Sequence, residues 1–177
     1  MKEQLDPESF KNLIGAVRDF PQPGITFRDI TPLLRKPGAL KTASAAMASE
    51  FTTSSITHVM GIESRGFLFG PAIADQLNLG FSPIRKPGKL PGKTISETYS
   101  LEYGTDSLEI QADIIGPGDR VLLVDDVLAT GGTLSAAERL VAATGAEVAG
   151  VTVLIELDFL KGREQLGVRH VVAVIHY

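Results

Sequence analysis

Residues 121 to 133 read Val-Leu-Leu-Val-Asp-Asp-Val-Leu-Ala-Thr-Gly-Gly-Thr, and this stretch decides the fold. The four apolar residues that open it are too few and too β-branched for a helix. An unbroken apolar run predicts a strand that is covered on both faces, as in a parallel sheet. Asp125 and Asp126 then fall at the carboxyl end of that strand, where ligands bind in open α/β sheets.

The second half of the stretch predicts a phosphate site. Thr130, Gly131, Gly132 and Thr133 supply backbone N–H groups and hydroxyls at the start of a helix with the apolar face Leu134, Ala137, Leu140 and Val141. A helix N-terminus with glycines that permit close approach binds phosphate. Vicinal carboxylates suit the adjacent hydroxyls of a ribose, so the two halves together indicate a ribose 5-phosphate. The alternative is a solvated strand end followed by a turn before a capped helix.

Composition excludes several classes of protein. A net charge of −4 argues against a nucleic-acid or membrane-surface partner. The 177 residues contain no cysteine, so neither a disulfide framework nor a thiolate metal site is present. No window approaches the roughly 18 apolar residues that a membrane span requires. We therefore expect a cytoplasmic protein with one domain, residues 1–177.

Strand and helix patterns alternate along the chain, which predicts an α/β fold with a central, mainly parallel sheet flanked by helices. We expect helices over about 6–17, 37–51 and 66–79, strands at 58–62, 81–85, 147–156 and 170–175, and an antiparallel pair, 99–103 and 108–114, joined by a turn at 104–107.

The stretch 121–133 resembles the phosphoribosyl-diphosphate motif of the type I phosphoribosyltransferases. Residues 20–30, 61–67, 84–92 and 99–104 are similar to members of that family that use adenine. The resemblance implies the type I phosphoribosyltransferase fold with a small N-terminal hood, about residues 1–35. It also implies a homodimer that transfers the 5-phosphoribosyl group of 5-phosphoribosyl 1-diphosphate to adenine, forming AMP and diphosphate in purine salvage.

The resemblance assigns residues to the ribose phosphate and to the diphosphate. The ribose phosphate would be bound by Asp125, Asp126, Ala129, Thr130, Gly131, Gly132 and Thr133, and the diphosphate by Glu63, Ser64, Arg65, Arg85, Lys86 and Lys89. It also implies a cis peptide between Glu63 and Ser64, and a Lys89 loop that enters the neighbour's site in dimers. From the residues alone, 63–66 is a strand-to-helix turn that can hold an anion. The cationic side chains of Arg85, Lys86 and Lys89 are either a solvated run of charge or groups that neutralise diphosphate.

Chemistry at the anomeric carbon of a ribose requires little covalent help from a protein. The enzyme must position the reactants, neutralise the leaving diphosphate and exclude water. By resemblance, Arg65 and Glu102 are catalytic, Glu102 as the acid/base that faces the purine, and Tyr103 accompanies it on a flexible loop. From the pattern alone, Glu102 is the polar member of an alternating strand. Mg²⁺ would be held by substrate oxygens and water, with no direct protein ligand.

The hood would bind the base. By resemblance, Phe27 stacks on adenine, backbone atoms near Thr26 and Arg28 read its edge, and Val127 closes the opposite face. Thr26 and Val127 depart from the branched apolar residues that are common there, but both keep a similar shape. The alternative is that Phe27 is a core residue of a small lobe.

Two functions other than transfer to adenine remain possible from the sequence. A sibling transferase acting on xanthine, hypoxanthine or orotate would differ in the hood residues. A regulatory protein could keep the diphosphate-binding motif as a sensor without turnover. Such a factor should carry an added DNA-binding region and a basic surface, and this chain has neither spare length nor positive charge.

Overall fold

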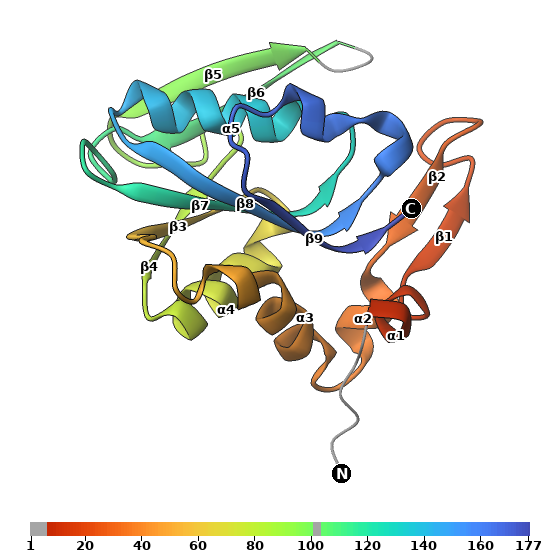
Figure 1. Ribbon diagram of the computed structural model, residues 1–177. Helices are drawn as coiled ribbons and strands as arrows, with labels where there is room; N and C mark the ends of the chain where they lie inside the picture. The colour runs from red at the N-terminus through yellow and green to blue at the C-terminus, as the bar shows by residue number, and fades with distance from the viewer. Residues whose placement is uncertain (1–6, 101–103) are drawn as a thin grey trace.

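The computed structural model describes residues 7–100 and 104–177, whose helices and strands largely alternate (Figure 1). The elements are α1 (Pro7–Lys11), β1 (Gly15–Arg18), β2 (Thr26–Asp29), α2 (Thr31–Arg35), α3 (Ala39–Ala48), η1 (Ser49–Phe51), β3 (His58–Ile62), α4 (Gly66–Leu77), β4 (Gly80–Ile84), β5 (Thr94–Ser100), β6 (Thr105–Gln111), β7 (Arg120–Leu128), α5 (Gly132–Ala143), β8 (Glu147–Glu156), η2 (Asp158–Leu160), η3 (Gly162–Gln165) and β9 (Val171–His176). Among these described elements, no helix is both long and apolar enough to cross a membrane.

A parallel sheet of five strands forms the centre of the described structure. Its strand order is β4-β3-β7-β8-β9, and every neighbouring pair is parallel. Helix α5 covers one face of the sheet, and α3 and α4 cover the other (Figure 1). The predicted α/β fold is therefore confirmed.

The packing of the middle strand, β7, explains why its apolar run is unbroken. Val121 and Leu123 pack into the cluster that contains the apolar face of α5. Leu122 and Val124, which point the opposite way, pack into the cluster that contains α3 and α4. All four side chains are fully buried. A strand with a hydrophobic layer on each face cannot alternate with polar residues.

The N-terminal segment differs from the sequence prediction. The helix expected over 6–17 ends at Lys11, and Gly15–Arg18 instead form β1, which pairs antiparallel with β2. Glycine is a poor helix former, and at Gly15 its small size is used, since a Cβ there would lie 3.2 Å from Asp29 Cβ. The apolar residues that suggest a longer helix thus belong partly to a hairpin, which forms the small N-terminal sheet.

The predicted antiparallel pair is present as β5 and β6, but its turn is misplaced. Ser100 pairs with Thr105 and Tyr99 pairs with Asp106, so residues 105–107 belong to a strand. Thr105, Asp106 and Ser107 are typical turn residues, and here they pair across the hairpin, with Thr98 and Ser107 hydroxyls 2.8 Å apart. The hairpin packs against α5. The remaining predicted elements lie within about two residues of their observed positions, except β7, which continues four residues beyond the predicted end at Val124.

Candidate active site

The adjacent carboxylates of Asp125 and Asp126 lie where β7 extends beyond its neighbour β3. Pairing between β3 and β7 ends at Gly61 and Val124, while β7 continues beside β8 as far as Leu128. Asp125 and Asp126 are therefore inside the strand rather than after it, on a stretch that β3 no longer covers. Both are nevertheless buried, with exposed fractions of 9% and 3%.

Burial and mutual repulsion dominate the electrostatics of this pair. Burial and the adjacent charge of Asp126 hold the pKa of Asp125 well above its ordinary value. Burial also raises the pKa of Asp126, although the Arg65 guanidinium opposes the shift, with Nε 3.1 Å from Asp126 Oδ2. The amide of Asp126 donates to Asp125 Oδ1 at 2.8 Å. Asp126 Oδ2 accepts no hydrogen bond from any described residue. An additional donor, such as a sugar hydroxyl, would satisfy it.

The loop of residues 129–133 leads directly from β7 into α5. Gly131 has a φ of 87° and caps the helix, whose first N–H groups have no partner within a helix. The loop is backed by η3, because a Cβ on Gly162 would lie 2.1 Å from the carbonyl oxygen of Ala129. The backbone of η3 is thus in direct contact with the backbone of the loop, and this contact fixes the position of the loop amides.

The loop after β3 holds the segment that carries Arg85 and Lys86. The Glu63–Ser64 peptide is cis, as the family resemblance implies. The Glu63 carboxylate accepts a hydrogen bond from the Lys86 amide at 2.9 Å and two from the Arg85 guanidinium at 3.2 Å each. The Lys86 amide lowers the pKa of Glu63, and Arg85 lowers it further. Glu63 is thus an ionised anchor for the basic segment.

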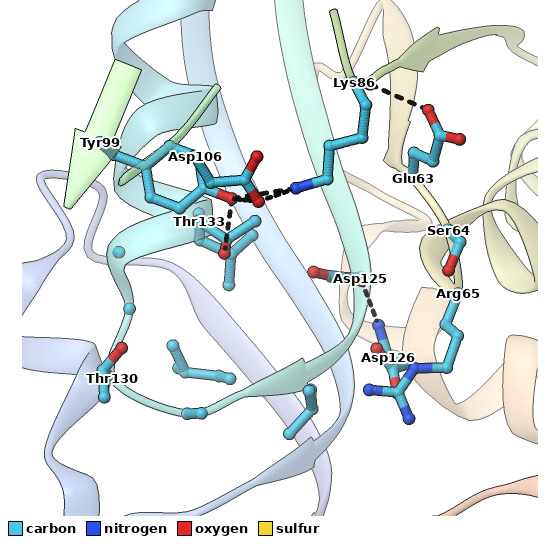
Figure 2. Close-up of a pocket in the computed structure, with 16 residues that line it drawn as sticks. Glu63, Ser64, Arg65, Lys86, Tyr99, Asp106, Asp125, Asp126, Thr130 and Thr133 are labelled. Atoms are coloured by element: carbon cyan, nitrogen blue, oxygen red, sulfur yellow. Dashed lines mark hydrogen bonds and ion pairs between the residues drawn. The ribbon is translucent and has the colours of Figure 1, made fainter. Parts of the chain in front are cut away.

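A network of polar side chains joins Lys86 to the β5–β6 hairpin and to α5 (Figure 2). Lys86 Nζ forms an ion pair with Asp106 and lies 3.5 Å from the Tyr99 hydroxyl. That hydroxyl donates to Asp106 at 3.3 Å and accepts from Thr133 at 3.4 Å. Burial alone would raise the pKa of Asp106, but the Lys86 hydrogen bond and the Ser107 amide hold it below its ordinary value.

These elements enclose a cavity of about 300 Å³. Its lining consists of the loop residues Glu63, Ser64 and Arg65, of Lys86, Tyr99 and Asp106, and of residues 125–134. The structure therefore brings together the residues assigned to the ribose phosphate and four of the six assigned to the diphosphate. Arg85 and Lys89 are outside this lining, and Lys89 is exposed, with its carbonyl accepting from Arg85 at 3.1 Å.

The base-binding residues are divided between the cavity and the hood. Val127 lines the cavity, whereas Thr26, Phe27 and Arg28 lie on β2 outside it. The Arg65 guanidinium connects the two parts, because its Cζ lies 4.9 Å from the centroid of the Phe27 ring. Phe27 is half-buried and is not a residue of either core cluster.

Two predicted residues lie outside the described part of the chain. Glu102 and Tyr103 fall between β5 and β6, in residues 101–103. Conversely, sequence reasoning missed Asp106, Tyr99 and Gly162 as parts of the site. The alternation of 99–114 indicates a hairpin, but the register that places Asp106 opposite Tyr99 follows only from the observed pairing. No sequence signal marks Gly162.

Among the described residues, one further group could hold a metal ion. Ligand atoms of Glu156, Asp158 and His176 lie within 4.8 Å of one another. The Glu156 carboxylate, however, accepts hydrogen bonds from Nε and Nη2 of the Arg163 guanidinium, and His176 Nδ1 lies 2.9 Å from Asp158 Oδ1. We interpret the group as an ion-pair network at the ends of β8 and β9.

Comparisons with known proteins agree with this geometry. Residues 29–174 match the family model described as phosphoribosyl transferase domain. The adenine phosphoribosyltransferase of Acidobacterium capsulatum is 51% identical over 96% of this chain and 94% of its own length. The crystal structure of the enzyme of that name from Rhodothermus marinus superposes with a TM-score of 0.90 at 51% identity, covering 97% and 98% of the two chains. The Saccharomyces cerevisiae enzyme, in complex with adenine and an imino-altritol bisphosphate, gives 0.89 at 41% identity over 95% and 97%.

The raised pKa of Asp125 predicts that this carboxyl destabilises the fold near neutral pH. As pH rises from the ordinary value of 3.8 through the raised one, the unfolded state ionises first and the folded state loses relative stability. We expect Asp125→Asn to be more stable than wild type at neutral pH, by about 1 kcal/mol or more, with a difference that disappears toward about pH 4. Urea unfolding across that range measures it.

Asp113→Asn is the matched control, because Asp113 is exposed on the loop after β6. It should leave the unfolding free energy near the wild-type value at each pH. A stability difference for Asp125→Asn that stays constant with pH, or a variant less stable than wild type at neutral pH, would contradict the electrostatic interpretation.

The contact between η3 and the loop of residues 129–133 predicts a second effect. Gly162→Ala should displace that loop, because the added Cβ meets backbone atoms of Ala129 and Gly131 at 2.1 and 2.9 Å. We expect the affinity for ribose 5-phosphate to fall about tenfold or more, since small displacements of a binding group are costly. Isothermal titration calorimetry measures it. Gly116→Ala is the control, as its Cβ would meet nothing within 4 Å; equal affinities for the two variants would contradict the argument.

Proposed function

The chain belongs to the phosphoribosyl transferase domain family, and we infer that its cavity transfers the 5-phosphoribosyl group of 5-phosphoribosyl 1-diphosphate to adenine, forming AMP and diphosphate. One observation supports this function most directly: two buried carboxylates and a helix N-terminus line the same cavity. The chain that contains this cavity is about half identical to adenine phosphoribosyltransferases. The reaction salvages a purine base as a nucleotide.

We propose that the ribose phosphate binds along β7 and its following loop. Asp125 and Asp126 would accept hydrogen bonds from the two ribose hydroxyls. Asp126 Oδ2 is a buried acceptor that forms an ion pair with Arg65 but accepts no hydrogen bond from the described residues. The 5′-phosphate would lie on the amides of residues 129–133 and on the hydroxyls of Thr130 and Thr133. The carboxylates and the loop line the same cavity, so one sugar phosphate could contact both.

The diphosphate would occupy the side of the cavity formed by Ser64, Arg65 and Lys86. Breaking the bond from the anomeric carbon to diphosphate leaves negative charge on the departing oxygens, and cations fixed in advance stabilise that charge. Arg65 and Lys86 are already held by Asp126 and Asp106. We propose that Arg85, held by Glu63 outside the cavity lining, contributes its charge from a greater distance.

The base would bind between the hood and Val127. The structure of the Saccharomyces cerevisiae enzyme contains adenine, and we propose the same base for this chain, stacked on Phe27. From the sequence resemblance, Glu102 would take or return the proton of the base nitrogen as the new bond to the anomeric carbon forms, with Tyr103 beside it.

We propose Mg²⁺ as the cofactor. The carboxylates of Asp125 and Asp126, one with an oxygen that lacks a hydrogen-bond donor, fit an ion that is held by substrate oxygens and water. Asp125 and Asp126 would then bind its waters and the ribose hydroxyls together. When bound, Mg²⁺ supplies positive charge to the diphosphate as it leaves.

We further propose that the protein is a homodimer, as the family resemblance implies. Lys89 is exposed on the loop after β4 and lies outside the cavity lining of its own chain, so a role at the diphosphate is best explained through a neighbouring copy. Sedimentation velocity would test the dimer directly, and a monomer at micromolar concentration would contradict it.

The experiment that tests the function measures nucleotide formation from 5-phosphoribosyl 1-diphosphate with Mg²⁺. Adenine, hypoxanthine, guanine, xanthine and orotate are offered side by side, with EDTA added in a parallel set. We expect AMP from adenine alone, and none with EDTA. Turnover of another base would overturn the assignment of the hood. Diphosphate binding without turnover of any base would favour a sensor.

The same assay tests the carboxylate pair. Asp126→Asn should lower kcat/KM about 100-fold, because it replaces a charged acceptor for the ribose hydroxyls by a neutral one. The Asp113→Asn control, on an exposed loop, should leave kcat/KM unchanged. Wild-type turnover in a folded Asp126→Asn protein would show that Asp126 has no part in binding the ribose.

A further inference from the structure

The position of the hood depends on side-chain contacts. The hairpin β1–β2 is a separate two-stranded sheet with no backbone pairing to the central sheet among the described residues. A two-stranded ribbon of this kind is at best marginally stable alone. Beyond Asp29, the chain enters the core at Ile30, which is buried, so one end of β2 is fixed. Thr26, at the other end, is exposed.

The two residues in the middle of β2 make contacts on opposite sides of the strand. Phe27 faces Arg65 at the cavity, with the guanidinium carbon 4.9 Å from the ring centroid. Arg28, the next residue, points the other way, as strand geometry requires. Its guanidinium carbon lies 3.6 Å from the centroid of the Tyr177 ring, which is a close cation–π stack.

Tyr177 is well placed to act as a fixed support. Its amide donates to the carbonyl of Glu156 at 3.0 Å, and its carbonyl accepts from the amide of Asp158 at 2.9 Å. Its side chain packs against the hydrophobic cluster that contains α3 and α4. Lys11 Nζ, from the end of α1, lies 5.8 Å from the same ring centroid. Figure 1 places this end of the chain beside β1 and β2.

We infer that Tyr177 is a positioning residue for the base: by stacking on Arg28, it determines where β2 presents Phe27 to the cavity. This inference rests on the proposed function. Tyr177 lies outside the lining of the cavity, and the groups proposed for ribose phosphate and diphosphate lie on other elements. Its loss should therefore affect adenine and leave the phosphoribosyl donor unaffected.

The test compares kinetic constants for the two substrates. Tyr177→Ala should raise KM for adenine about tenfold, the scale of one partly buried cation–π contact. KM for 5-phosphoribosyl 1-diphosphate and kcat at saturating adenine should stay within about twofold. Tyr177→Phe keeps the ring face and should restore the wild-type KM. Phe159→Ala, which removes an aromatic side chain that is 71% exposed on η2, is the matched control and should change nothing.

Hydrogen exchange provides a readout that does not depend on turnover. Amides of β1 and β2 should exchange faster in Tyr177→Ala than in wild type or Tyr177→Phe, and amides of β7 should not. If Tyr177→Ala does not fold, Tyr177→Leu keeps apolar bulk without a ring face and is judged by the same criteria.

The inference is overturned if KM for adenine is unchanged, if both KM values rise equally, or if hood exchange is the same in the variant and wild type. Wild-type protein that turns over no adenine contradicts the proposed function instead, while the exchange measurement still decides whether Tyr177 holds the hood.

Discussion

The burial of two adjacent carboxylates at the end of β7 is the constraint on which the rest of the site depends. Folding removes Asp125 and Asp126 from water and raises the pKa of both. Among the residues that the structure describes, Arg65 is the one counter-charge, and it approaches on the Asp126 side. That approach requires Gly66, because a Cβ there would lie 2.5 Å from the carbonyl oxygen of Val124. The start of α4 is therefore packed directly against β7, and Arg65 follows from that packing.

The cations of the site are fixed by anions of the protein itself. Glu63 holds Arg85, and Asp106 holds Lys86. A cation held in this way loses little conformational freedom when an anionic ligand arrives, and fixed charges of this kind are effective in catalysis. In the β5–β6 hairpin, Tyr99 and Asp106 connect Lys86 to α5 through Thr133, so the two sides of the cavity share one hydrogen-bond network.

Hydrophobic periodicity was sufficient wherever an element packs on the central sheet. The strands β3, β4, β8 and β9 and the helices α3, α4 and α5 are found near their predicted positions, because burial on one or both faces imposes the pattern that the sequence displays. Prediction failed in the hood and at the hairpin turn, where few side chains are buried. There, Gly15 and Asp106 take part in strand pairing that their local propensities do not favour.

The sequence by itself determined that a buried strand with two adjacent carboxylates runs into a glycine-containing loop and a helix at residues 121–133, because these parts are contiguous. The family resemblance extended that inference to the reaction. Only the tertiary structure decided which distant groups meet: Arg65 with Asp126, Lys86 with Asp106, and Arg28 with Tyr177. Each of these contacts depends on strand register or on the packing of separate elements. Register and packing result from many weak interactions along the whole chain, so the local sequence around the contacting residues does not reveal the contact.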